Sequence, residues 1–164
     1  MNIRDKLADG WIHSNIIIEI LGKPPAYVDK IIKEVVESIK KIEGIEVINA
    51  NFHEPREAKT LFSTFAEIEL IAQDIMKLTE LVFNYMPSNI EIIEPENMKI
   101  DLVKANDFFN MLASKLHAYD SSIKGLKFET LYLKKTLEKA GLTPKQPAQE
   151  IKPAILEETK EKKE

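Results

Sequence analysis

The sequence predicts an α+β fold in which an antiparallel sheet carries two helices on one face and is followed by one long helix. Three observations lead to this prediction. Four short segments rich in β-branched residues alternate with two amphipathic segments in the order strand, helix, strand, strand, helix, strand. Across residues 101–140, apolar residues then recur every three or four positions. With 44% hydrophobic and 30% charged residues, the composition is that of a globular chain.

The first strand and helix are expected in residues 11–44, after a polar lead-in at residues 1–10. Residues 11–21 carry apolar and β-branched side chains at both odd and even positions, and therefore on both faces of a strand, which is typical of a covered central strand. Proline at the start of the next helix costs no hydrogen bond, because the first N–H groups of a helix have no partner within it. Gly44 is predicted to end that helix as a left-handed cap. The apolar stripe consists of Val28, Ile31, Ile32, Val35, Val36, Ile39 and Ile42.

The other three strands are expected at residues 45–53, 59–71 and 90–93, with a turn at residues 54–57. After the strand at residues 59–71, Asp74 is expected to cap a second helix, and Pro87 is expected to end that helix. Because successive side chains of a strand point to opposite faces, the strand at residues 59–71 has a core side and an acidic side that is mostly exposed to water. The core side holds Phe62, Thr64, Ala66, Ile68 and Leu70, and the wet side holds Ser63, Phe65, Glu67 and Glu69.

This order of elements resembles the split βαβ sandwich of ferredoxin-like folds, which we expect over residues 11–97. Within such folds, residues 16–95 look like the layout of ACT-type small-molecule regulatory domains, where a Gly/Pro turn follows the first strand. Here the turn is Gly22, Lys23, Pro24 and Pro25, preceded by Leu21 where that family usually has an aspartate. The resemblance implies a small ligand, such as an amino acid, bound beside this turn.

Residues 101–140 carry a heptad repeat over more than five heptads, which is the pattern of a helix whose apolar edge faces another helix. At about 1.5 Å per residue this helix would be roughly 60 Å long, too long to be covered by a small domain. We therefore expect the chain to associate with itself. The seam has Leu102, Phe109, Leu116, Ile123, Thr130 and Leu137 at position a, and Ala105, Leu112, Tyr119, Leu126, Leu133 and Ala140 at position d. The predicted contacts are Phe109, Leu112, Leu116, Tyr119, Ile123, Leu126, Leu133 and Leu137.

Charges beside the seam favour pairing between copies. In a parallel two-stranded coil, Lys115 would meet Asp120 of the second chain, and Glu129 would meet Lys134. Each exposed pair contributes only tenths of a kcal/mol, so the pairs bear on register and orientation more than on affinity. Whether the coil is parallel stays open at this stage.

Two alternatives concern the same helix. Phe128, Leu131 and Tyr132 lie off the seam as a second apolar patch, which indicates three or more helices or another protein packed there. Alternatively, the helix breaks at residues 120–122, whose Asp and Ser side chains can cap a new helix, and folds back as a hairpin. Gly125 would weaken the turn after such a break. The unbroken phase of the seam favours a continuous helix.

The sequence offers no recognisable catalytic, metal or cofactor motif, so no catalytic residue, metal or cofactor is expected. Absence of cysteine excludes disulfides and thiolate ligands, and it favours a cytoplasmic location. No apolar run is long enough to span a membrane. Of the three histidines, His13, His53 and His117, the His53-Glu54 pair is the most site-like, but we interpret it as an exposed turn because no third ligand can be named.

Nucleic-acid binding is not expected, although RNA-recognition domains share this order of elements. The third strand lacks glycine, its open face carries Glu67 and Glu69, and the net charge is −4. Acidic groups repel phosphate.

The sequence thus predicts a non-enzymatic, homo-oligomeric interaction or scaffold protein, with a ligand-sensing regulatory module as the alternative. Residues 141–164 are expected to be a disordered charged tail.

Overall fold

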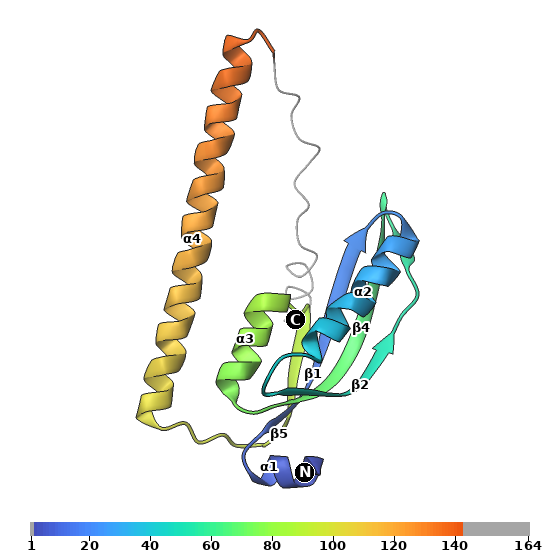
Figure 1. The fold of residues 1–164 in the computed structure, drawn as a ribbon, viewed down its shortest axis with the longest axis vertical. Helices are drawn as coiled ribbons and strands as arrows, with labels where there is room; N and C mark the ends of the chain where they lie inside the picture. Colours follow the sequence, from blue (N-terminus) through green and yellow to red (C-terminus); the bar gives the residue numbers. More distant parts are fainter. Residues whose placement is uncertain (1, 143–164) are drawn as a thin grey trace, which may run out of the picture. The chain divides into compact units, whose positions relative to one another are not determined.

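The structure is a computed structural model that describes residues 2–142 (Figure 1). The predicted tail lies almost wholly outside these described residues. The chain divides into two compact units, Met1–Lys115 and Leu116–Glu164, and the first contains the sheet. Its elements are α1 (Ile3–Ala8), β1 (Ile12–Gly22), α2 (Pro25–Ile39), β2 (Ile45–Phe52), β3 (Arg56–Ala58), β4 (Leu61–Ala72), α3 (Ile75–Tyr85) and β5 (Asn89–Glu94), and α4 (Leu102–Lys139) begins in it.

The main strands lie in the order β2-β4-β1-β5, and every neighbouring pair is antiparallel. This is the order of a ferredoxin-like sandwich, so the predicted fold class is confirmed. The structure adds β3, which pairs with β4 where the sequence predicted only a turn. Lys59 adopts a left-handed conformation, with a φ of 56°, in the tight connection between these two strands. That conformation lets the chain reverse at once and pair Ala58 with Leu61.

Both α2 and α3 pack on the same face of the sheet, and one hydrophobic cluster joins them to it. The helix α2 buries Val28, Ile32, Val36 and Ile39, which recur at the spacing of one helical face. On the sheet, one buried row runs from Ile68 in β4 to Ile16 in β1, and it continues to Ile90 in the edge strand β5. Ile90 is 40% exposed, because the edge strand is only partly covered. The core thus lies over the centre of the sheet.

Element boundaries follow local hydrogen bonds. The carboxylate of Asp74 accepts the N–H of Lys77 at 2.9 Å, which confirms the predicted cap of α3. The predicted end of α2 was wrong, since the helix stops at Ile39 and Gly44 lies in the turn to β2. Gly44 still has the predicted left-handed backbone, with a φ of 83°, and its carbonyl accepts the N–H of Gln73 at 2.8 Å. The glycine therefore positions the start of β2 rather than capping the helix.

The helix α4 is continuous for 38 residues, which corresponds to a length of roughly 57 Å. The alternative of a break at residues 120–122 is therefore wrong. Ser122 donates its hydroxyl to the carbonyl of Ala118 at 3.0 Å, and Asp120 pairs with Lys124 at 2.6 Å. These side chains bond within the helix and do not cap a new one.

Candidate self-association surface

The predicted contact residues of α4 stay accessible in the single chain. Phe109, Leu116, Ile123, Leu126 and Leu133 are between 51% and 66% exposed, and Leu112, Tyr119 and Leu137 are half-buried. No residue of α4 is buried. Large apolar side chains on one edge of a helix are normally covered, so this edge is a candidate binding surface.

Exposure along the seam is not uniform. In the first turns of α4, which belong to the same unit as the sheet, Ala105 and Leu112 at position d are half-buried, whereas Leu102 and Phe109 at position a are exposed. Close to that half-buried side, Lys115 donates its ammonium to the amide oxygen of Asn84 in α3 at 3.4 Å. Lys115, which flanks the d side, therefore has a contact within its own unit. Between residues 116 and 133, which we call the open part of the seam, every seam residue except the half-buried Tyr119 is exposed.

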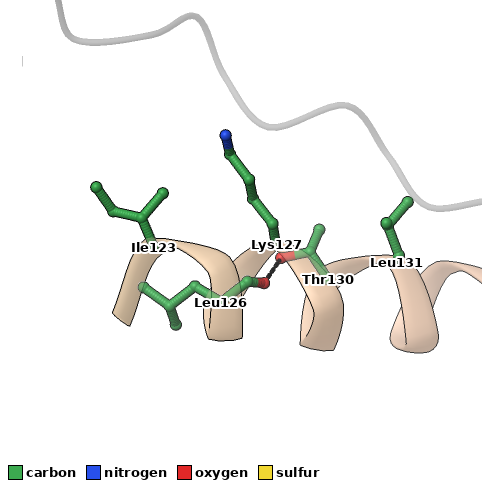
Figure 2. A pocket seen from close by; sticks show the side chains of 5 residues that line it. All are labelled: Ile123, Leu126, Lys127, Thr130 and Leu131. Carbon is green, nitrogen blue, oxygen red and sulfur yellow. Dashed lines mark hydrogen bonds between the residues drawn. The ribbon is translucent and has the colours of Figure 1, made fainter. Parts of the chain in front are cut away.

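Thr130 is the one polar residue of the seam in its most open part. Its hydroxyl donates to the carbonyl of Leu126 at 2.7 Å, as Figure 2 shows. The hydrogen bond satisfies the hydroxyl inside the helix, so burying Thr130 against a partner would leave no unpaired group. Ile123, Leu126 and Leu131 lie beside it in Figure 2 and line an open apolar hollow with Lys127. Thr130 therefore does not interrupt the apolar character of the seam.

The second apolar patch is also exposed. Phe128, Leu131 and Tyr132 are 76%, 58% and 64% exposed. They occupy heptad positions f, b and c, which face away from the partner in a two-stranded coil. A coil of two helices would therefore leave this patch uncovered, and it stays a predicted contact for further helices or another protein.

Replacing Gly125 with alanine is expected to stabilise α4 by about 1 kcal/mol, because glycine is the weaker helix former. An added Cβ would meet nothing within 4 Å, so no clash opposes the gain. Urea unfolding followed by circular dichroism at a fixed protein concentration measures the change. The same substitution at Gly44 should have the opposite sign, costing about 1–2 kcal/mol, because alanine is strained at a positive φ. Destabilisation by Gly125→Ala would contradict a continuous helix.

The predicted ligand turn is formed by consecutive residues between β1 and α2. Gly22 ends β1, Pro24 precedes α2, and Pro25 is its first residue. An added Cβ on Gly22 would lie 3.0 Å from the Cγ1 of buried Val28, so this glycine lets α2 pack closely on the sheet. Pro25 lines a shallow hollow of about 560 Å³, and the other lining residues are Ala26, Asp29, Lys33, Phe52, His53, Glu54 and Pro55.

The start of α2 offers this hollow few backbone hydrogen-bond donors. Pro24 and Pro25 have no backbone N–H, and the N–H groups of Tyr27 and Val28 donate to the carbonyl of Pro24 at 3.0 and 3.3 Å. The start of α2 is therefore a poor anion site. Asp29 and Lys33 neutralise each other at 2.7 Å.

Two histidines on the open face of the sheet lie close to carboxylates. The Nε2 of His13 lies 2.8 Å from a carboxylate oxygen of Glu69. His53 stacks on Phe65 with ring centroids 3.9 Å apart, and its Nε2 is 3.5 Å from a carboxylate oxygen of Glu67. This Nε2 is buried and has no hydrogen-bond partner among the described residues, so Glu67 is a close neighbour of His53 and does not bond to it. Among residues 2–142, no three His, Asp or Glu side chains gather as metal ligands would.

Two further findings bear on the kind of protein this is. Within the described part of the chain, no helix has the length and apolar character that crossing a membrane requires. The model of the MJ0538 family matches residues 13–146, which runs from β1 through all of α4. The family description names no activity. No curated protein matches the chain.

Proposed function

The chain belongs to the MJ0538 family, and we propose that it is a non-enzymatic scaffold or interaction protein that assembles with copies of itself through α4. The observation that carries this proposal is the exposed seam between residues 116 and 133. The sheet unit would then be a head that each copy contributes to the assembly.

The stability of α4 supports the need for a partner. In water, most helical stability in proteins comes from packing of an apolar face, and helical propensity alone is marginal. The part of α4 beyond Lys115 has no buried residue, and it contains Gly125 and several β-branched residues that weaken a helix. A partner that covers the seam would supply the missing packing.

A second copy of the same helix fits this surface best. The 3.5-residue period is the one that keeps an apolar edge against another helix over many turns. A second α4 brings the same period and the same length, so knobs and holes match along the whole overlap. A globular partner would need only a short stretch of such a repeat.

The mass of the full-length protein in solution tests the proposal. Light scattering at tens of micromolar should give a multiple of the 18.8 kDa chain mass. Dilution should shift the mass toward that of one chain, as expected for a reversible assembly. A single-chain mass at tens of micromolar would end the proposal.

The alternative function, a regulatory module that senses a small molecule, is supported by the hollow beside Pro25. Its recognition would depend on side chains such as Lys33 and His53, since the helix start offers few donors. A ligand of this hollow would raise the melting temperature by mass action. A panel of amino acids and nucleotides without any shift would count against this alternative.

A further inference from the structure

We propose that neighbouring α4 helices in the assembly run parallel and in register, so that Thr130 of one copy faces Thr130 of the next. This inference rests on the proposed function and specifies its geometry. It brings the first residues of the α4 helices to the same end of the coil. Three properties of α4 carry it: the charges that flank the seam, the residue types within its open part, and the state of the Thr130 hydroxyl.

Flanking charges favour the parallel arrangement. In a parallel coil, position g of one copy faces position e of the next heptad in the other. Lys115 then meets Asp120 of the second copy, and Glu129 meets Lys134. Symmetry repeats each pair, which gives four attractive contacts and no repulsive one. Asp120 already pairs with Lys124 on its own helix, and its second oxygen remains available to accept another ammonium.

Antiparallel arrangements gain less. There position g faces g and position e faces e, and the register that overlaps most of the seam sets Lys115 against Glu129 twice. The same register places Asp120 against Asp120 of the second copy, which is repulsive. Sliding by one heptad sets Asp120 against Lys127 twice but loses the first pair. Each of these two antiparallel registers keeps one kind of attractive contact, whereas the parallel register keeps two.

Residue types in the open part of the seam bear on the number of strands. Ile123 and Thr130 at position a are β-branched and Leu116 at a is not, while Tyr119, Leu126 and Leu133 occupy position d. In a parallel coil, β-branched residues at a with leucine at d favour two strands. Both β-branched residues are accessible in the single chain, so no rearrangement of the helix is needed for pairing.

Thr130 would sit opposite itself without cost. Because its hydroxyl is bonded to the Leu126 carbonyl, the threonine can present its methyl group to the methyl group of the second copy. In the antiparallel registers it would face Leu112 or Tyr119 instead.

The absence of cysteine in the natural chain allows a direct test by cross-linking. In the full-length protein, Thr130→Cys should form a disulfide-linked dimer on mild oxidation, because facing a positions bring Cα atoms within disulfide range. Ser121→Cys is the matched control, since position f points away from the seam. Non-reducing electrophoresis should show most of the Thr130→Cys protein, and little of the Ser121→Cys protein, as a linked dimer. Light scattering under reducing conditions confirms that both variants still assemble.

The outcomes separate the orientation from the assembly itself. If Thr130→Cys assembles but does not cross-link, the parallel register is overturned and self-association stands. If both cysteine variants cross-link equally, random collision explains the bond and the register is likewise overturned. If the wild-type protein has the mass of one chain, the proposed function fails, whatever the cross-linking shows.

Discussion

Replacing both Leu116 and Leu126 with aspartate is expected to convert the assembled protein into single chains. The two residues occupy positions a and d in the open part of the seam, and they are 60% and 63% exposed in the single chain. Assembly would bury four unpaired carboxylates per pair of helices, and each such burial costs several kcal/mol. Light scattering at tens of micromolar should therefore give the mass of one chain, about 18.8 kDa.

A matched control separates the seam from net charge. Ser114→Asp with Ser121→Asp adds the same charge to the same helix at two f positions, away from the seam, and should leave the mass unchanged. Dissociation of this control would show that charge repulsion in general separates the copies. Retention of the assembled mass by the Leu116→Asp, Leu126→Asp variant would place the contact elsewhere on the protein.

The fold was readable from the sequence because its main elements leave strong periodic patterns. The stripe of α2 and the alternation of β4 follow from burial on one face, so both elements were predicted within a few residues. The sequence predictions were wrong for short segments and helix ends, where no pattern of buried residues marks the boundary of an element. The three residues of β3 contain no buried side chain, and Ile42 continued the stripe of α2 past the true end at Ile39.

The candidate surface could be predicted for a similar reason, because a heptad repeat is visible in the sequence alone. Which of its residues stay open was not readable, because that depends on contacts distant in sequence. The contact of Lys115 with Asn84, for example, joins residues 31 positions apart. The proximity of His53 to Glu67 was not predicted, because the strand register, and not sequence adjacency, brings the two residues together.

Replacing Ile68 with alanine is expected to destabilise the sheet unit by about 2–5 kcal/mol, the range for removing a large aliphatic side chain from a core. Ile68 is fully buried at the centre of β4, in the row that contains Ile16. Ile90 lies in the same row on the edge strand, 40% exposed, and offers a matched control. Its replacement by alanine should cost clearly less, since part of its surface already contacts water. Urea unfolding monitored by circular dichroism measures both changes.

The same variant tests whether head and coil are separable. Ile68 belongs to the core of the unit that ends at Lys115, whereas the open seam begins at Leu116. At a temperature where Ile68→Ala is still folded, its assembled mass should equal that of the wild type, because no seam residue has changed. An assembled mass below that of the wild type under those conditions would mean that copies also associate through the sheet unit. The exposed edge strand β5, with Ile90, Ile92 and Ile93 about 40% exposed, would then be the surface to change next.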